Sequence, residues 1–102
     1  MKPNITMFFP AYNEEENIPK LVSSAQKVLK ETANNYEIIV VVYDGSTDRT
    51  AEIVEKLSKR DNRIRLIHQQ KNQKGMGIAL KLGFENAKYD LIFYADSDNQ
   101  FD

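Results

Sequence analysis

The sequence predicts an α/β fold in which a parallel four-stranded sheet forms the middle of three layers, with helices on both of its faces. Four short apolar runs alternate with three segments of helical spacing, in the order β-α-β-α-β-α-β. Two of the runs, EIIVVVY and LIFYA, are nearly continuous, as strands buried on both faces are. With the right-handed crossovers that connect parallel strands, we expect the strand order 3-2-1-4.

Each expected element has its own local signal. The strands are expected at four apolar runs, which are Ile5–Phe9, Glu37–Tyr43, Ile64–His68 and Leu91–Ala95. Helices are expected where apolar residues recur every three or four positions, within 18–29, 51–57 and 79–87. Asp48 is a candidate N-cap for the second helix. No repeat, low-complexity segment or linker interrupts the chain, so we expect one domain, residues 1–102.

The composition is that of an ordinary globular protein and argues against several functions. Lys and Arg total 14 against 15 acidic residues, so no footprint for nucleic acid or an anionic membrane is expected. The absence of cysteine excludes disulfides and thiolate metal sites and fits a reducing compartment, so we expect a cytoplasmic location. No run approaches the roughly 18 apolar residues of a membrane span, so no membrane contact is expected from this segment.

Polar clusters follow three of the four expected strands. FFPAYNEEE spans the end of the first strand, YDGSTD follows the second, and DSDNQ follows the fourth. In the expected order, the second and third strands lie on one side of the first strand and the fourth lies on its other side. The direction in which strands are added to the sheet therefore switches between the first and fourth strands. Ligands of such sheets bind at the carboxyl ends of the strands beside this switch point. The three clusters therefore predict a ligand site at this edge of the sheet.

The cluster DSDNQ places two carboxylates, Asp96 and Asp98, two residues apart just after a strand. Two such side chains can turn toward one point. Mg²⁺ or Mn²⁺ takes hard oxygen ligands of this kind and often completes its shell with water and a substrate diphosphate. The alternative is a solvated loop with an aspartate that caps a following helix, because short DxD motifs also occur by chance. The position at the switch point favours the metal.

The other two clusters offer groups for a nucleoside. Tyr12 offers a ring for a base or ribose, Glu14 offers an acceptor, and Asp44 can accept from a base N–H or a ribose hydroxyl. Gly45 and Asp48 are explained by a strand-to-helix turn alone. Asp44 has no such local explanation, so it is the acceptor that we assign to the ligand.

The segment KGMGIA, residues 74–79, is neither a GxGxxG nor a Walker motif. We expect Gly75 and Gly77 to let the loop after the third strand approach the site closely, with Lys74 as a candidate phosphate contact. His68 is the only histidine. We expect it to be structural or solvent-facing, because no cysteine or second histidine accompanies it.

Four motifs in one order resemble those of the family 2 glycosyltransferases, particularly the polyprenyl-phosphate (dolichol-phosphate) mannosyl- and glucosyltransferases. They are Pro-Ala-Tyr-Asn-Glu, Asp-Gly-Ser-Thr-Asp, Gly-x-Gly-x-Ala and Asp-Ser-Asp-Asn-Gln, and they extend over the whole chain. The resemblance implies a GT-A fold, of which this chain would be the Rossmann-like, N-terminal donor-binding half. It also implies a GDP- or UDP-sugar donor, a divalent metal (Mg²⁺ or Mn²⁺), and inversion of the anomeric centre.

The resemblance also implies roles for single residues. The implied substrate-binding residues are Pro10, Ala11, Tyr12, Glu14, Val42, Asp44, Ala95, Asp96, Ser97 and Asp98. Of these, the residues up to position 44 would hold the nucleoside and those from position 95 onward would line the diphosphate. The implied metal-site residues are Asp96, Asp98 and Gln100. The metal would act as a Lewis acid on the departing nucleoside diphosphate.

The chain departs from the family pattern in three ways. Tyr43 stands where the family usually has an acid, and the loop before Gly75 is about one residue longer than is common. Family members also need more than twice this length, and their second half would carry the acceptor site and the general base. We therefore expect a truncated donor-binding half that is inactive alone, and we assign no catalytic residue.

Two other interpretations remain open. The haloacid-dehalogenase phosphatases also place DxD after a buried strand, but Gln100 stands where they normally have Thr or Val. The more serious alternative is a non-catalytic folding or assembly module derived from a glycosyltransferase half-domain. Because residues 91–95 would form an open sheet edge, we also expect pairing with a second copy of the chain, as a homodimer.

Overall fold

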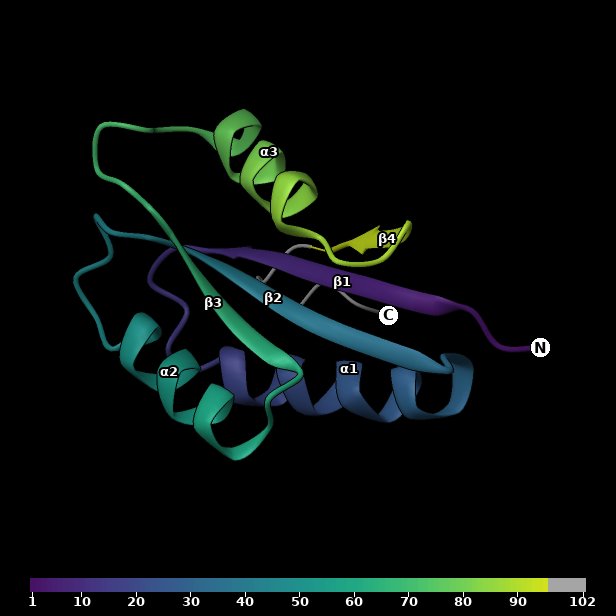
Figure 1. The fold of residues 1–102 in the computed structure, drawn as a ribbon. Coiled ribbons are helices and arrows are strands. Elements are labelled where there is room, and N and C mark those ends of the chain that lie inside the picture. The colour runs from purple at the N-terminus through teal and green to yellow at the C-terminus, as the bar shows by residue number, and fades with distance from the viewer. Residues whose placement is uncertain (96–102) are drawn as a thin grey trace.

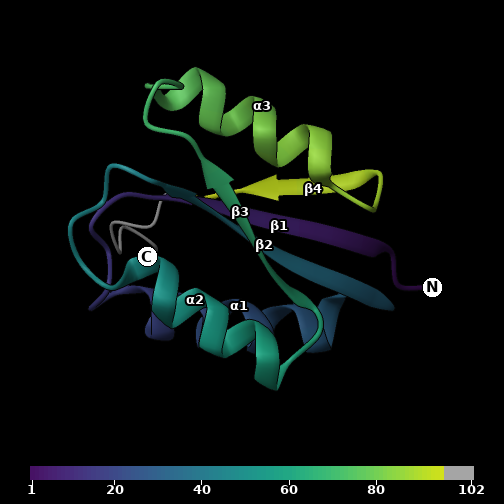
Figure 2. The same ribbon diagram turned by 60° about the vertical axis from the view of Figure 1, so that its left-hand side comes forward.

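The computed structural model describes residues 1–95, which form a parallel four-stranded sheet between two layers of helices. The strand order is β3-β2-β1-β4, and every neighbouring pair is parallel. Helices α1 and α2 lie on one face of the sheet and α3 lies on the other (Figures 1 and 2). The predicted fold class and strand order are confirmed. The elements are β1 (Asn4–Ala11), α1 (Ile18–Thr32), β2 (Asn35–Tyr43), α2 (Thr50–Arg60), β3 (Ile64–Gln69), α3 (Met76–Asn86) and β4 (Leu91–Tyr94).

The apolar run of β2 is continuous because helices cover the sheet on both sides. Side chains alternate between the two faces along a strand. Val40 and Val42 belong to the larger core, with residues of α1 and α2, whereas Ile39 and Val41 belong to the smaller core beside α3. Each of these four side chains is at most 1% exposed. At about 1.5–3 kcal/mol for each buried side chain, β2 contributes strongly to the stability of the sheet.

β1 extends two residues beyond its predicted end, so Pro10 lies inside the strand rather than after it. Pro10 is the register partner of Val41 in β2. Proline is normally disfavoured in a central strand because it has no N–H to donate. Here the main-chain oxygen of Phe8 accepts from Ala95 on the β4 side, and the register pairs of β4 end at Phe8. Pro10, two residues further on, turns its nitrogen to that same side, beyond the last of these pairs.

Helix α2 begins at Thr50, and Asp48 is not its N-cap residue. Arg49 occupies the N-cap position and makes no side-chain capping bond. Asp48 instead reaches forward two residues, where its Oδ1 accepts from the N–H of Thr50 at 3.0 Å. Asp48 therefore satisfies the first N–H of α2, but from the position before the N-cap rather than from the N-cap itself.

In residues 1–95, no helix has the length and the apolar character needed to cross a membrane.

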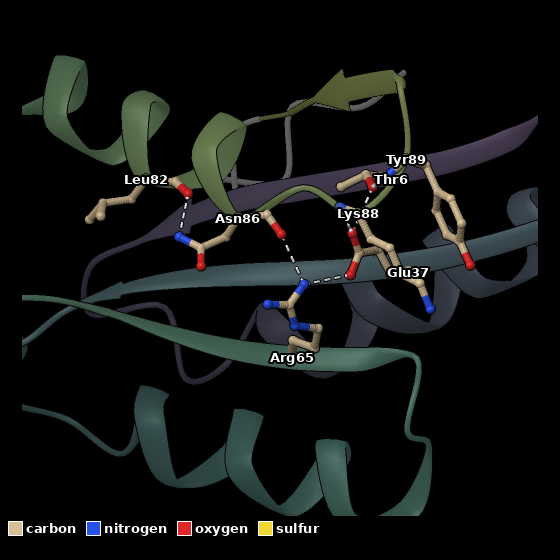
Figure 3. A network of polar contacts seen from close by, with 7 residues as sticks. All are labelled: Thr6, Glu37, Arg65, Leu82, Asn86, Lys88 and Tyr89. Carbon is tan, nitrogen blue, oxygen red and sulfur yellow. Dashed lines mark hydrogen bonds and ion pairs between the residues drawn. The ribbon is translucent and has the colours of Figure 1, made fainter.

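A buried polar network lies toward the amino ends of the strands, on the α3 side of the sheet (Figure 3). Glu37 is 4% exposed. Its carboxylate accepts from Thr6 Oγ1 at 2.8 Å, from Arg65 Nη1 at 2.7 Å and from the N–H of Lys88. Arg65 Nη1 also donates to the carbonyl of Asn86 at 2.9 Å. Burial alone would raise the pKa of Glu37, but these hydrogen bonds and the Arg65 charge leave that pKa below its ordinary value of 4.5.

This network fixes the position of the segment that leads into β4. Asn86 is the last residue of α3, Lys88 belongs to the turn between α3 and β4, and Glu37 and Arg65 belong to β2 and β3. Their hydrogen bonds therefore fasten the start of β4 to the centre of the sheet. Nothing in the sequence pattern alone indicated these partners.

β4 is an edge strand, and its apolar sequence is less buried than the continuous run suggested. Leu91, Phe93 and Tyr94 are 42%, 48% and 40% exposed. Within residues 1–95, β4 pairs only with β1. Ile92 packs against the core beside α3, and the Tyr94 ring lies beside that of Phe8, with centroids 5.6 Å apart. The predicted open edge at this strand is present in the part of the chain that is described.

Candidate functional site

A cleft of about 580 Å³ lies at the carboxyl ends of the strands, where the sequence predicted a ligand site. Four predicted residues, Pro10, Ala11, Tyr12 and Glu14, line it from the end of β1 and the loop that follows. The remaining lining residues come from the ends of β2 and β3, from the loop after β3 and from the start of α3, and they are Tyr43, Gln69, Lys74, Gly75, Met76 and Ala79. A cleft of this size is within the range of small-molecule sites.

Two tyrosines form an aromatic wall of the cleft. The rings of Tyr12 and Tyr43 meet edge to face, with centroids 5.5 Å apart and an interplanar angle of 66°. The Tyr43 hydroxyl donates to the carbonyl of Lys71 at 3.0 Å. The ring lies so close over Gly45 that a Cβ there would be 2.1 Å from a ring atom. Tyr43 thus adds a second ring beside Tyr12, which is 56% exposed and available to stack on a base or ribose.

The opposite wall is the loop between β3 and α3. The buried side chain of Gln69 donates from Nε2 to the carbonyls of Gln73 and Gly75, at 3.1 Å in the second case. Gly75 has a φ of 106°, a conformation that requires glycine, and it immediately precedes α3. A Cβ at Gly75 or at Gly77 would meet no heavy atom of residues 1–95 within 4 Å, so the close approach predicted for the two glycines stays a prediction. Gly75 and Gln69 therefore shape the loop that brings Lys74 to the cleft.

The loops that follow β1 and β2 are tied to each other. Asn13 has a φ of 52°, which is uncommon for a residue other than glycine but tolerated by asparagine. Its N–H donates to Ser46 Oγ at 3.1 Å, and its Oδ1 accepts from the N–H of Thr47 at 2.7 Å. The two polar clusters that the sequence placed at one edge therefore form a single hydrogen-bonded unit.

Asp48 is the centre of this unit. Its Oδ2 accepts from the N–H of Glu15 at 3.1 Å, and its Oδ1 accepts from the N–H and the hydroxyl of Thr50. The same hydroxyl accepts from the N–H of Glu14 at 2.9 Å. Burial raises the pKa of Asp48, but these hydrogen bonds outweigh it and lower the pKa below its ordinary value. Asp48 therefore holds the Glu14 backbone in place at the cleft.

Asp44 lies beside the cleft rather than among its lining residues, and it is paired with His68. His68 Nδ1 is 2.7 Å from Asp44 Oδ1, and both side chains are exposed to solvent. Since a carboxylate only accepts, the ring must donate from Nδ1. The prediction that His68 is structural or solvent-facing missed this contact. The signal for it is the register, because His68 pairs with Val42, two residues before Asp44.

Two further predicted residues serve mainly in packing. Val42 is 1% exposed in the larger core, so its side chain has almost no surface to offer to a ligand. Ala95 donates its N–H to Phe8 at 3.2 Å and packs against the same core. Asp96, Ser97, Asp98 and Gln100 lie outside the described residues. Among residues 1–95, no group of three His, Asp or Glu side chains is arranged to hold a metal ion.

Comparison with known proteins assigns the family. The profile of glycosyl transferase family 2 matches residues 6–102 of the 102-residue chain. The chain belongs to glycosyl transferase family 2. The resemblance that the four ordered motifs indicated is therefore confirmed, and with it the glycosyltransferase class of the chain.

Three proteins illustrate what this family 2 chain is similar to. It is 38% identical over 103 residues to the dolichyl-phosphate beta-glucosyltransferase ALG5D of Trichomonas vaginalis, a match that covers 95% of this chain and 31% of the relative. It is 35% identical over 97 residues to the undecaprenyl-phosphate 4-deoxy-4-formamido-L-arabinose transferase of Proteus mirabilis, covering 94% and 29%.

The third protein is a solved structure, glucosyl-3-phosphoglycerate synthase from Mycobacterium tuberculosis in complex with Mn²⁺, UDP and phosphoglyceric acid. It matches the fold with a TM-score of 0.69 at 28% identity, over 94% of this chain and 33% of that one. The family 2 chain thus spans about a third of the length of all three proteins.

Proposed function

We propose that this chain is the donor-binding half of an inverting family 2 glycosyltransferase. As a single cytoplasmic domain, residues 1–102, it binds a nucleoside-diphosphate sugar, a GDP- or UDP-sugar, together with Mg²⁺ or Mn²⁺. In the whole protein the sugar passes to a polyprenyl phosphate, the acceptor class that the names of two relatives contain. The observation that carries the proposal is the cleft beside the switch point, with Tyr12, Tyr43 and Glu14 in its walls.

The cleft supplies groups suited to a nucleoside. Stacking on an aromatic ring accepts any base, because every base has a π-face. Tyr12 is the exposed ring, and Tyr43 supports it through an edge-to-face contact. Glu14 offers a carboxylate to ribose hydroxyls, while Asp44 keeps one oxygen, Oδ2, that makes no hydrogen bond within residues 1–95. Asp44 with His68 then lies at the margin of the nucleoside rather than beneath it.

The diphosphate and the metal are assigned to the segment that follows β4. Ala95 continues the ladder beside β1, so the described part of the chain ends at the carboxyl edge of the sheet. Asp96, Asp98 and Gln100 carry the hard oxygen ligands that Mg²⁺ and Mn²⁺ prefer, with Ser97 beside the diphosphate. The metal would neutralise charge on the departing nucleoside diphosphate. The Mn²⁺ and UDP in the solved relative support this assignment.

The nucleoside part of the proposal is tested by isothermal titration of UDP and GDP into the Tyr12→Ala variant in Mn²⁺. Affinity should fall roughly tenfold, because stacking of a base on an aromatic ring contributes about 1–3 kcal/mol. Phe84→Ala is the matched control, since Phe84 is a similarly exposed ring on α3 that does not line the cleft. Equal affinities in the two variants would place the nucleoside elsewhere.

Nucleotide binding separates the proposal from its main alternative, a non-catalytic folding or assembly module, and turnover tests whether the chain is inactive alone. The chain should bind donor without transferring sugar, because we expect the general base to belong to the second half of family members and assign that role to no residue here. A radiolabelled nucleotide-sugar assay with polyprenyl phosphate checks this expectation. Transfer by the pure 102-residue chain would mean that the catalytic residues lie within residues 1–102, and a chain that binds no nucleotide at all would support the module.

We also propose that the chain forms a homodimer through the edge of β4. An edge strand offers unpaired main-chain donors and acceptors to another chain. Leu91 and Phe93 are both exposed on this strand. Sedimentation equilibrium at micromolar concentration should give a dimer, which Phe93→Lys should weaken. A clean monomer before any substitution would contradict the proposal.

A further inference from the structure

A second cavity lies near the amino ends of β2 and β3, at the opposite end of the sheet from the cleft. Its volume is about 550 Å³. The residues that matter for its chemistry are Tyr36, Glu37, Arg63, Arg65, Lys88 and Tyr89. They come from β2, from the turn before β3, from β3 itself and from the turn between α3 and β4. The cavity is therefore built from segments far apart in the sequence.

The cavity has an excess of positive charge. Arg63, Arg65 and Lys88 supply three positive charges against the single negative charge of Glu37. The chain as a whole has a formal net charge of −1, so this excess does not follow from its composition. Within residues 1–95, neither Arg63 nor Lys88 forms an ion pair. Two positive charges at one cavity thus have no ion-pair partner among the described residues.

The nearby carboxylates are already engaged. Both oxygens of Glu37 accept hydrogen bonds, one from Arg65 and the other from Thr6 and Lys88. Asp61 does not line the cavity, and its carboxylate accepts from the N–H of Arg63 at 3.0 Å and from the side-chain amide of Gln26 at 2.9 Å. Arg65 uses only Nη1 for its described bonds. Its other guanidinium nitrogens remain available at the cavity.

Aromatic rings hold the two unpaired cations in place. The guanidinium carbon of Arg63 lies 5.1 Å from the centroid of the Tyr36 ring, and Lys88 Nζ lies 5.5 Å from that of Tyr89. Figure 3 shows Lys88 and Tyr89 extending in the same direction from the turn before β4. Cation–π contacts of this kind restrict the side chains. Side chains that are already restricted lose less freedom when a ligand binds.

We propose that this cavity binds a ligand through a phosphate group. A phosphate monoester carries about −1.5 to −2 charges at pH 7, which matches the uncompensated charge better than a single carboxylate does. Guanidinium groups can form paired hydrogen bonds with phosphate oxygens, and a lysine adds a point charge. The proposal is independent of the proposed glycosyltransferase function, because no residue of this cavity lines the donor cleft.

The phosphate can belong to a soluble compound or to a lipid headgroup, since both present the same oxygens. Two arms of one experiment separate these sources. In the first, ¹H–¹⁵N NMR follows titration with inorganic phosphate and pyrophosphate in the presence of EDTA, so that no divalent metal contributes. In the second, the chain is sedimented with phosphatidylcholine vesicles that do or do not carry phosphatidic acid.

The test variant is Arg63→Ser/Lys88→Ser, and Lys27→Ser/Lys56→Ser is its matched control. All four side chains are exposed, and both double variants remove two positive charges. Arg65 is left intact because it belongs to the buried network. The test variant should lose affinity roughly tenfold, as expected for two lost charge-assisted contacts, while the control stays within about twofold of the unmodified chain. Thermal unfolding of each variant verifies that the fold is retained.

The location of the shifts and the pairwise comparison decide the outcome. Amide shifts at residues 62–65 and 88–89 with soluble phosphate, lost in the test variant alone, support a soluble ligand. Vesicle binding that requires phosphatidic acid and is lost in the test variant alone supports a lipid headgroup. Equal losses in both double variants, shifts elsewhere, or no binding in either arm would overturn the proposal. Tyr12→Ala should leave this binding unchanged, which keeps the result separate from the nucleoside site.

Discussion

Replacement of Glu37 by glutamine tests how the chain fastens β4 to the sheet. Glutamine has nearly the same shape but carries no charge, and it replaces one acceptor oxygen with an NH₂ group. One carboxylate oxygen of Glu37 accepts from Arg65, and the other accepts from Thr6 and Lys88. Whichever way the new amide is turned, at least one of these donors faces another donor. The variant therefore loses a hydrogen bond as well as an ion pair.

The expected loss follows from the burial of the partners. A hydrogen bond to a charged group contributes about 1.5–3 kcal/mol, and a neutral one about 1 kcal/mol. The Arg65 side chain is 39% exposed, so water partly replaces its lost partner and the lower figure applies. Together these give a loss of about 2–3 kcal/mol in the free energy of unfolding. For a domain of this size, that corresponds to a decrease in Tm of roughly 10–20 °C.

Urea and thermal unfolding followed by circular dichroism measure this loss. Glu31→Gln is the matched control, because Glu31 is an exposed glutamate on α1. The dependence of the unfolding free energy on urea should be the same in both variants. If Glu37→Gln stays within about 0.5 kcal/mol of the control, a range typical of surface substitutions, the network does not hold the sheet together as argued.

The pH dependence gives an independent check with a definite sign. The pKa of Glu37 is lowered in the folded protein from its ordinary value of 4.5. Its contribution to stability is therefore fully present above that value and is lost as the pH falls through the folded pKa. The difference in stability between the unmodified chain and Glu37→Gln should shrink as the pH falls below 4.5. A difference that stays constant in acid would contradict the assignment.

Three further substitutions probe the cleft and its margin. Gly45→Ala places a methyl group 2.1 Å from a Tyr43 ring atom, so the ring must move out of the cleft wall and nucleotide affinity should fall severalfold. An unchanged affinity in the titration would mean that Tyr43 does not contribute to nucleotide binding. Asp48→Asn should lower the free energy of unfolding by about 1–2 kcal/mol at neutral pH, and by less in acid because the folded pKa of Asp48 is lowered. Urea unfolding that shows no loss at neutral pH would contradict this role. His68→Ala should change stability by no more than about 1 kcal/mol, since the pair is exposed, yet alter the preference between UDP and GDP by freeing Asp44. An unchanged preference would mean that Asp44 does not contact the base.

The arrangement of the strands could be predicted from the sequence because it depends on features that are local or general. Continuous apolar runs indicate buried strands, and the helical segments between them require parallel pairing with right-handed crossovers. The position of Pro10 could not be predicted in the same way. Whether proline is tolerated there depends on where the pairing of β4 with β1 ends, and that is a property of the assembled sheet.

The site was predicted in part for a related reason. Tyr12 and Glu14 follow the end of a strand, so topology alone brings them to the cleft. The contact of His68 with Asp44 depends on the register between β2 and β3, which the spacing of apolar residues leaves open. The role of Gln69 could not be predicted either, because in the sequence it is only a polar residue after an apolar run. Its role depends on the bond that it donates to the Gly75 carbonyl.

The central claim is that nucleotide binding at the carboxyl edge of the sheet depends on a divalent metal held after β4. Isothermal titration of UDP and GDP, with Mn²⁺ and with EDTA, into the unmodified chain and the Asp96→Asn/Asp98→Asn variant tests this claim most directly. We expect Mn²⁺ to strengthen nucleotide binding by the unmodified chain and to have no effect on the variant, because amides replace the charged oxygen ligands. Binding that responds equally to Mn²⁺ in both proteins, or no nucleotide binding by the unmodified chain, would contradict the account.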